Sequence, residues 1–509
     1  MSGYGIAVQS PQVMILMAVS TTLLAFRCLG IPDAAGGLVL TQSRADLEDP
    51  LDNAMLQELS GKLSDYVQRF DACFLSPPSR DHLHAYVRGQ IGPLQRKSVE
   101  PIALEVGMQP RTLQQFLGFH KWDEEAMRAQ VRSIARAEHA DPHAVGIIDE
   151  TSFNKKGKKT VGVQRQWCGH TGKIDNCVQT VHLTYVAREF AAIIDSDLYL
   201  PEDWAEDKIR RVEAGVLDEV TFRKKWEIAL ELLARAKREG VPICWVTTDE
   251  FHGRASEFLL GVEGLGMLHV VEVPVGTWGW TARAFARGQR HRRIDELFKR
   301  GGPSWIDYHV KDTTRGPVVW RVRAPRFVPH AGLDRSEKWL LIAINPLDGE
   351  AKYFVSNASA ETQVETLLTV AFTRWRIEHN FEESKQEIGL DHFEVRTYTG
   401  LQRHLAISMV SRLFLVRATL DFRAQTADHW TVPQTRLIVN TLADQEISSL
   451  ERTRQLERNL NKIVYWQRRA KVAEDCHRRR RLRDLASAGV DLPQARMCPA
   501  WPAGPRGHP

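Results

Sequence analysis

Apolar and polar residues alternate with helical spacing through residues 52–140, which predicts a helical N-terminal part. Within it, "SVEPIALEVGMQPRTLQQFL" (98–117) has the outline of a helix, a turn at Gly107 and a second helix that begins near Pro110. This outline resembles a helix-turn-helix, whose second helix enters the major groove of DNA. An ordinary helical hairpin has the same pattern, so both interpretations stay open.

From residue 144 the helical spacing gives way to short apolar runs that predict the strands of a sheet. Two of these runs, "AVGIIDE" and "VPICWVTTDE", end in acidic residues. Two more, "VGVQRQWCG" and "CVQTVHLTYVA", are rich in Val, Thr and aromatic residues, and "LGMLHVVEVP" predicts one more strand. An amphipathic helix over residues 219–240, closed by Gly240, separates the early strands from the later ones. This order predicts an α/β sheet of mixed strand direction.

The pattern changes again at residues 277–350, which are rich in Trp, Arg, Gly and Pro and predict a β-rich insertion. A strand at 352–357, a long helix from about Thr362 to Lys385 and an apolar helix over 404–420 are expected to follow. Residues 451–484 then contain twelve Lys and Arg against five acidic residues, which predicts a basic helical region. Pro, Gly and Ala dominate the end of the chain and predict disorder.

These changes predict seven regions. They are an N-terminal extension (1–50), a helical DNA-binding domain (51–140), the first part of an α/β domain (141–276), the β-rich insertion (277–350), the second part of the α/β domain (351–425), a basic helical C-terminal region (426–491) and a disordered tail (492–509).

Composition narrows the protein class only slightly. The chain has 509 residues, 43% hydrophobic and 26% charged, as in folded soluble proteins, and its net charge of +5 permits a nucleic-acid partner without requiring one. Its seven cysteines form no CxxC pair, which argues against a zinc ribbon or a disulfide scaffold and favours a reducing cytoplasm. The apolar run at 13–26 is shorter than the roughly 20 residues of a membrane span, so an extension is favoured over a membrane anchor.

Two acidic residues stand at the carboxyl ends of predicted strands, the edge where ligands collect in open α/β sheets. Asp149 and Asp249 would repel each other there unless a cation bridged them, and Mg²⁺ prefers carboxylate oxygens. Glu150 and Glu250 follow directly and compete for any role, because neighbouring side chains on a strand face opposite sides. The pattern alone does not choose between them, and each acid taken singly is more typical of a strand end or a helix cap than of a catalytic site.

A third acidic residue, Glu378, lies in "TRWRIEHNFEESK" (373–385) on the long predicted helix. At 100° per residue, Glu378 lies about 40° and Lys385 about 20° round the helix from Arg374, so the three share one stripe. Exposed amphipathic helices often have this spacing, and the stripe gains weight only from the two strand-end acids.

Taken together, these segments resemble a bacterial insertion-sequence transposase of the DDE superfamily. The resemblance rests on "GIIDETSFNKKGKKTVGVQRQWCGHTGKIDNCVQTV", "WVTTDEFHG" and "RWRIEHNFEESKQEIGLDHFEVR", with 100 residues between Asp149 and Asp249 and 129 between Asp249 and Glu378, and it covers about 70–485. One branch of the superfamily has a β-rich insertion and a helix signature of Tyr, Arg, Glu and Lys. Arg374, Glu378 and Lys385 match this signature, whereas Ala371 occupies the Tyr position, so the chain lies near that branch.

The resemblance implies an RNase-H-like mixed sheet with flanking helices, interrupted by the insertion, with helical N-terminal and basic helical C-terminal parts. It also implies that Asp149, Asp249 and Glu378 are the catalytic and metal-binding residues. The expected cofactor is Mg²⁺, with Mn²⁺ as a substitute and two ions bound, and Arg374 and Lys385 are expected to contact DNA phosphates.

The activity implied is that of a transposase. It would bind insertion-sequence ends, hydrolyse phosphodiesters with divalent metal and join the 3′-OH ends to target DNA by strand transfer. The partners implied are double-stranded DNA, as inverted-repeat ends and as target, and a second copy of the chain in the DNA complex. No membrane is involved, and a cytoplasmic, nucleoid-associated location is expected.

Further DNA contacts are expected where basic residues gather. Residues 278–300 contain seven Lys and Arg against two acidic residues, and Arg290, Arg292 and Arg293 are the candidates there. The basic helix around Tyr465–Arg483 is a second candidate. By the resemblance, a tryptophan of the insertion would stack on a flipped base. The candidates are Trp305, Trp320 and Trp339, and packing in the core is the commoner role of each.

Three other functions fit parts of the pattern. A metal-dependent nuclease of the same fold without strand transfer has the same three acids. A captured transposase kept as a DNA-binding or regulatory protein would explain the Ala at the Tyr position. A glycosidase with a carboxylate pair fits the acids, but it explains neither the Arg and Lys stripe nor the basic C-terminal region.

Overall fold

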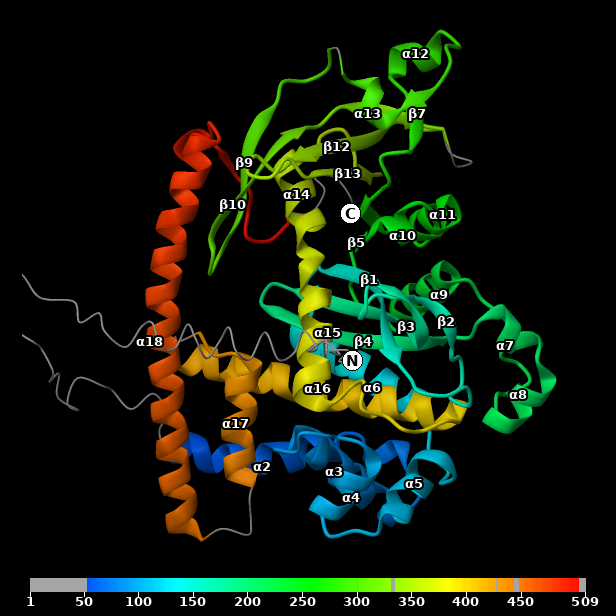
Figure 1. Ribbon diagram of the computed structural model, residues 1–509, viewed down its shortest axis with the longest axis vertical. Helices are drawn as coiled ribbons and strands as arrows, with labels where there is room; N and C mark the ends of the chain where they lie inside the picture. Colours follow the sequence, from blue (N-terminus) through cyan, green and yellow to red (C-terminus); the bar gives the residue numbers. More distant parts are fainter. Residues whose placement is uncertain (1–52, 300, 331–334, 427–428, 444–447, 503–509) are drawn as a thin grey trace, which may run out of the picture. The chain divides into compact units, whose positions relative to one another are not determined.

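The computed structural model describes residues 53–299, 301–330, 335–426, 429–443 and 448–502 (Figure 1). The chain divides into two units, 1–52 and 53–509, and the predicted N-terminal extension lies outside the described residues. No helix in the part of the chain that is described has the length and apolar character needed to cross a membrane.

The N-terminal part of the described chain is helical, as the spacing predicts. Its helices are α2 (Asn53–Gln68), α3 (Pro77–Ile91), α4 (Val99–Glu105), α5 (Pro110–Gly118) and α6 (Glu124–His139), with a short 3-10 turn, η2 (Asp71–Cys73). The outline of a helix, a turn and a second helix is confirmed for α4 and α5, and Gly107 in the turn has a φ of 68°. These helices pack against the long helix α16 (Tyr398–Thr426), where Gln90 is hydrogen-bonded to Ser408 and Ser411.

The central sheet has mixed strand direction. Its strands, in spatial order, are β4 (Phe190–Tyr199), β3 (Lys173–Ala187), β1 (Val145–Asn154), β5 (Trp245–Thr248) and β6 (Leu268–Glu272). β1 is antiparallel to β3 and parallel to β5, which is parallel to β6. Helices α9 (Lys225–Arg238) and α16 pack against it, and the buried apolar runs of β1 and β5 form its core. The predicted RNase-H-like mixed α/β fold class is therefore confirmed.

The insertion is β-rich as predicted, but it continues the central sheet. β13 (Ala351–Ser356) pairs antiparallel with β6, and the strands that follow outward are β12 (Lys338–Ile344), β10 (Gly316–Arg323) and β9 (Ile306–Thr313) (Figure 1). A small outer group consists of β7 (Trp278–Trp280), α12 (Ala282–Ala286), β8 (Arg292–Arg293), α13 (Ile294–Leu297) and β11 (Arg326–Pro329).

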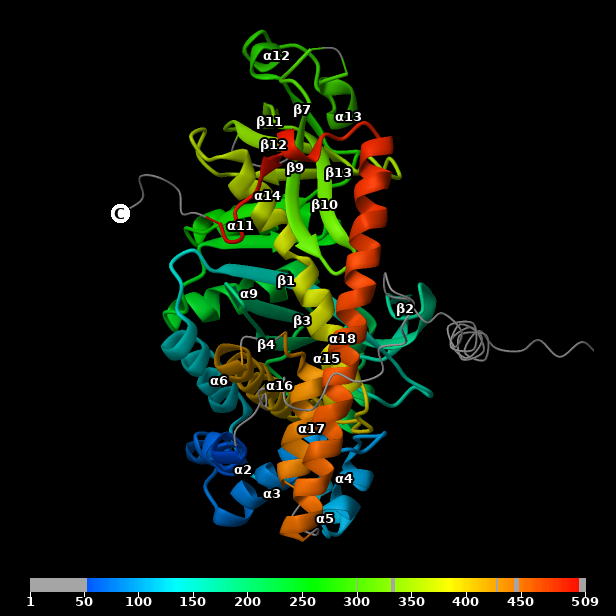
Figure 2. The ribbon, with the colours of Figure 1, turned by 90° about the vertical axis from the view of Figure 1, so that its left-hand side faces the viewer.

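The basic C-terminal region is helical. It contains α17 (Val432–Ala443) and the long α18 (Ser449–Ser487), and both views show α18 running from α17 to the strands of the insertion (Figure 1, Figure 2). The remaining elements are β2 (Gln164–Cys168), α7 (Glu202–Glu206), α8 (Lys208–Ala214), α10 (Glu250–Gly253), α11 (Ser256–Gly264), α14 (Val364–Thr373) and α15 (Trp375–Ile388).

The expectation of a disordered tail from residue 492 is corrected for residues 492–502. They form η3 (Leu492–Gln494) and β14 (Arg496–Met497), which pairs with the edge strand β9. The Cys498 backbone N–H donates to the His309 carbonyl at 2.9 Å, and the Thr369 hydroxyl donates to the Pro499 carbonyl at 3.0 Å. Main-chain pairing and burial of Cys498 order this segment, and neither depends on its Pro- and Ala-rich composition.

A buried ion cluster joins α6 to the sheet and to α9. The Arg132 guanidinium, fully buried, lies 2.9 Å from the carboxylate of Asp195 on β4 and donates to Glu125 at 2.7 Å and to Glu239 at 2.7 and 2.6 Å. Burial raises the pKa of Asp195 to about 6, although Arg235, Arg132 and Arg128 oppose the shift. Burying the Asp195 carboxylate therefore costs free energy of folding, and the arginines of the cluster offset this cost only in part.

Candidate active site

Two aspartates are brought together by the parallel pairing of β1 and β5. The register runs from Val145 opposite Trp245 to Ile148 opposite Thr248, so Asp149 and Asp249 follow at neighbouring strand ends. Asp249 also caps α10 and accepts a hydrogen bond from the His252 backbone N–H at 3.2 Å. This is the strand-end pair that the sequence predicts.

The glutamates that follow the two aspartates have other partners. Glu150 accepts a hydrogen bond from the Lys225 ammonium of α9 at 2.9 Å. Glu250, the first residue of α10, accepts a hydrogen bond at 3.2 Å from Arg254, which directly follows the helix. Asp149 instead lies 3.4 Å from the Arg374 guanidinium. This separation supports the assignment of Asp149 and Asp249, which stays a prediction, over that of the glutamates.

The two aspartates titrate differently because their surroundings differ. Burial and the charges of Asp249 and Glu150 raise the pKa of Asp149 well above its usual range, and Arg374 opposes the shift. Burial acts in the same direction on Asp249, but hydrogen bonds from His252 and the charges of His252 and Arg374 hold its pKa below the usual value. Two crowded carboxylates of this kind form a site that a cation would stabilise.

The predicted long helix consists of α14 and α15, which meet at Arg374 with helical dihedral angles (φ −52°, ψ −35°) and extend to Ile388. Arg374 bridges the strand ends and the helix, because its guanidinium lies 3.4 Å from Asp149 and 2.7 Å from Glu378. Lys385, about three turns further along the same stripe, directs its ammonium group toward the Ser152 carbonyl of β1 at 3.5 Å. Burial lowers the pKa of this lysine.

The structure brings Asp149, Asp249 and Arg374 together but leaves Glu378 apart from the aspartates. The Glu378 side chain is 55% exposed and is held by Arg374. Among the described residues, no group of three or more His, Cys, Asp or Glu side chains is arranged to hold a metal ion. The two aspartates have the donor chemistry for a divalent cation. Glu378 would have to turn away from Arg374 to join them.

The Ala371 position explains the departure from the Tyr, Arg, Glu and Lys signature. Ala371 is 4% exposed and lies in the main hydrophobic core on α14. A tyrosine side chain at this position would have to displace its core neighbours before it could reach DNA.

Sequence reasoning missed His252, which lies next to the acidic pair. Its ring is fully buried, with Nδ1 3.3 Å from Asp249 and 3.7 Å from Glu150, and its Nε2 has no hydrogen-bond partner among the described residues. The signal was present in "TDEFHG", because a side chain three residues after a helix cap lies one turn away from it.

The candidate DNA-contacting residues of the insertion lie mostly at the surface. Arg290 and Arg292 are exposed, and Arg293 pairs with Asp295 at 3.1 Å. Of the three tryptophans, Trp320 is buried against Phe372, as core packing requires. Trp305 is 38% exposed, and the Trp339 indole donates to the Ser359 carbonyl.

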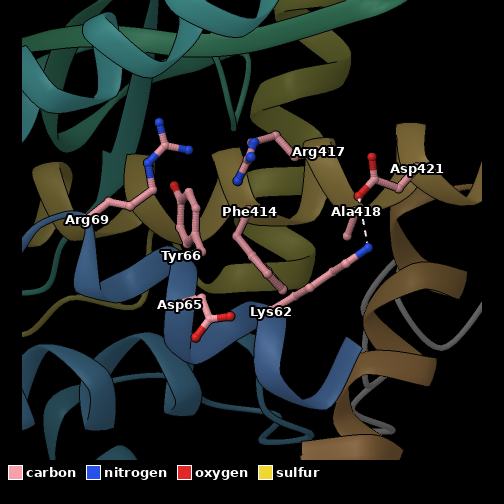
Figure 3. Close-up of a pocket in the computed structure, with 8 residues that line it drawn as sticks. All are labelled: Lys62, Asp65, Tyr66, Arg69, Phe414, Arg417, Ala418 and Asp421. Atoms are coloured by element: carbon pink, nitrogen blue, oxygen red, sulfur yellow. Dashed lines mark ion pairs between the residues drawn. The ribbon is translucent and has the colours of Figure 1, made fainter. Parts of the chain in front are cut away.

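A cavity of about 280 Å³ lies between α2 and α16 (Figure 3). Its lining contains none of the predicted site residues and includes a Lys62–Asp421 ion pair at 3.8 Å; it is formed by Lys62, Asp65, Tyr66, Arg69, Phe414, Arg417, Ala418 and Asp421. Asp149 and Asp249 lie elsewhere, at the strand ends of β1 and β5.

Comparisons with known proteins bear on the family of the chain. Residues 69–321 match the family model of the DDE superfamily endonucleases. A relative from Microchaete diplosiphon, named "Probable transposase for insertion sequence element IS701", is 29% identical over 216 residues, which are 42% of this chain and 53% of the relative. The match thus spans about half of the relative's length. The family match includes Asp149 and Asp249 and ends before Glu378.

Proposed function

Because the chain belongs to the DDE superfamily of endonucleases, we propose that it is an insertion-sequence transposase. It binds the ends of its element, cuts DNA by metal-dependent hydrolysis and joins the freed 3′-OH ends to target DNA. The observation that carries this proposal is the pair of aspartates at adjacent parallel strand ends with Arg374 against one of them.

DDE enzymes use divalent metal ions, and we propose Asp149, Asp249 and Glu378 as the residues that hold them, with Mg²⁺ as the natural ion and two ions in the complete site. When bound, such ions polarise the phosphate and activate the attacking hydroxyl. Because burial raises the pKa of Asp149, a bound cation would favour its ionised carboxylate.

Arg374 has two tasks in this proposal. In the free protein its guanidinium balances the negative charge of Asp149 and holds Glu378. When Glu378 turns toward the aspartates, the side of the guanidinium that held it becomes available to a DNA phosphate. Lys385, Arg290, Arg292, Arg293 and the basic face of α18 would hold the rest of the DNA backbone.

The substrate and assembly follow from the same chemistry. Joining two element ends to one target requires two catalytic sites, so we propose a homodimer on double-stranded DNA. The expected place of action is the bacterial nucleoid in the cytoplasm.

Replacing Arg374 by Gln is expected to slow cleavage about 100-fold, because transition-state charge on the phosphate loses one cationic partner. Arg374→Lys keeps the charge but loses the fork that reaches two carboxylates, so an intermediate loss is expected. Single-turnover cleavage rates measure both effects. Equal rates in the parent protein and Arg374→Gln would remove Arg374 from the site.

The proposal is tested with a DNA fragment that carries the flanks of the gene, incubated with the protein and Mg²⁺ or Mn²⁺. Cuts at the flanks that require metal, and joining of the cut ends to a second plasmid, are the expected results. Cutting without joining would indicate a nuclease of the same fold. Specific binding without cutting, in either metal, would indicate a captured DNA-binding protein.

A further inference from the structure

A rigid lysine-containing loop follows the strand that carries Asp149. The loop (155–160) has the sequence "KKGKKT" and is fixed to β3 by Asn176, whose amide donates to the Lys155 carbonyl at 2.6 Å and to the Gly157 carbonyl at 2.8 Å. The Lys155 ammonium donates to the Phe393 carbonyl at 2.7 Å and covers the Phe393 ring. Gly157, with a φ of 89°, allows the turn.

This anchoring presents three lysines to solvent. Lys156, Lys158 and Lys159 are exposed, and within the described residues none of their ammonium groups has an ion-pair partner. Three neighbouring cations on a fixed backbone repel one another, and an anionic ligand would relieve the repulsion.

Next to the loop, the β2–β3 hairpin exposes an apolar pair. Trp167 and Ile174 are directly opposite each other across the two strands, and they are 61% and 59% exposed. Arg165, two residues before Trp167, is exposed on the same face. A large indole left in water beside unpaired cations is typical of a surface that stacks on nucleic-acid bases.

The loop and the apolar pair belong to one face of the hairpin. Asn176, which holds the loop, is the cross-strand partner of Arg165, so its side chain lies on the face that also carries Trp167 and Ile174. The turn of the hairpin reaches β1, because the Gly169 backbone N–H donates to the Ser152 hydroxyl at 3.4 Å, and the Lys385 ammonium group lies at the Ser152 carbonyl. At about 3.4 Å per residue, the end of β1 at Asn154 lies roughly 17 Å from Asp149, a span of a few nucleotides.

We propose that the lysine loop (155–160) and the Trp167–Ile174 pair bind an unpaired DNA strand beside the cutting site. Lys156, Lys158 and Lys159 bind backbone phosphates, and the Trp167 indole stacks on an exposed base. Bases inside an intact duplex are stacked on each other and offer no face to Trp167, so the surface discriminates frayed from paired DNA. This inference rests on the proposed function, because it assigns a second contact to the same DNA.

The test measures binding of two fluorescent DNA fragments that carry the gene's flank, one fully paired and one with a short unpaired tail. Trp167→Ala is expected to weaken binding of the tailed fragment about tenfold and to leave the paired fragment within twofold. Trp167→Phe keeps an aromatic face and is expected to retain most of the affinity. An equal loss on both fragments, or no loss on either, would overturn the stacking role.

The lysines are tested through the salt dependence of binding. The triple variant Lys156→Gln, Lys158→Gln, Lys159→Gln is expected to lower the slope of log K against log salt by about 2 to 3, since each lost phosphate contact lowers it by about 0.7 to 0.9. Lys208→Gln, an exposed lysine on α8, is the control and leaves the slope within 1 of the parent. An unchanged slope in the triple variant would overturn the phosphate role.

These outcomes separate this inference from the proposed function. If the parent protein binds neither fragment, both are wrong. If the parent protein binds and cuts the flank but the Trp167 and lysine variants behave as the parent does, only the second contact is wrong.

Discussion

Replacing Asp249 by Asn is expected to slow metal-dependent DNA cleavage at least about 1,000-fold while leaving the protein folded. A carboxylate that holds a divalent ion stabilises the charge that develops on the phosphate, and the neutral amide binds such an ion far less well. Asn has nearly the same size and still caps α10 through its side-chain oxygen. Glu250→Gln, at the neighbouring exposed position, is the matched control and should cleave within tenfold of the parent.

Asp149→Asn is expected to abolish cleavage as well. The same substitution is also expected to change the thermal stability of the protein. The pKa of Asp149 is raised in the folded protein, mainly by burial, so the folded state holds its proton to higher pH than the unfolded state does. Ionising Asp149 therefore lowers the stability as pH rises through this window. The asparagine variant should unfold at a higher temperature than the parent at neutral pH, and the difference should shrink in acid.

Thermal unfolding between pH 4 and 8 measures the effect, and Glu150→Gln is the control. That substitution breaks the ion pair with Lys225, so a lower unfolding temperature is expected with cleavage largely retained. A lower unfolding temperature for Asp149→Asn at neutral pH would show that the ionised Asp149 carboxylate does not destabilise the fold. The electrostatic reason for placing a cation at this site would then be wrong.

Arg132→Met is expected to lower the free energy of unfolding by about 3–5 kcal/mol, because it leaves Asp195 buried with its nearest cation removed. Both side chains are fully buried at 2.9 Å, and Arg235 is left as the nearest cation at 3.4 Å. The pKa of Asp195, about 6 with Arg132 present, should rise further in the variant. Since a raised carboxyl pKa destabilises the fold as pH increases, the loss should be larger at pH 8 than at pH 5.

Urea unfolding at the two pH values measures this loss. Arg136→Met is the control, because Arg136 is exposed on the same helix and, among the described residues, donates only to the Glu239 carbonyl. A loss below about 1 kcal/mol is expected for it. The double variant Arg132→Met, Asp195→Asn should recover part of the stability, since no unpaired charge is left in the core. Equal losses in the single and double variants would show that Arg132 stabilises the fold by packing and not by its charge.

Those parts of the structure that depend on local pattern could be predicted from the sequence. The apolar runs that end in Asp149 and Asp249 are buried strands because no charged side chain interrupts them, and the helix around Arg374 follows from its apolar spacing. The fold class and the DDE resemblance rest on these elements. The domain boundaries and the roles of the site residues stay predictions.

The parts that depend on long-range pairing could not be predicted. Nothing in the local pattern of β13 shows that it pairs with β6 and makes the insertion part of the central sheet. Residues 492–502 are ordered by strand β9, far from them in sequence. The Glu378 side chain pairs with Arg374 and does not reach the aspartates, and helical spacing alone does not decide between these two directions.

The most direct test of the central claim is the position of Mn²⁺, located by its anomalous diffraction in crystals of the protein with DNA carrying one element end. We predict Mn²⁺ within about 2.5 Å of carboxylate oxygens of both Asp149 and Asp249, with the Glu378 carboxylate turned from Arg374 toward the ion. Mn²⁺ bound by Asp249, His252 and Glu150, with Asp149 still paired to Arg374 and Glu378 still pointing to solvent, would contradict the account.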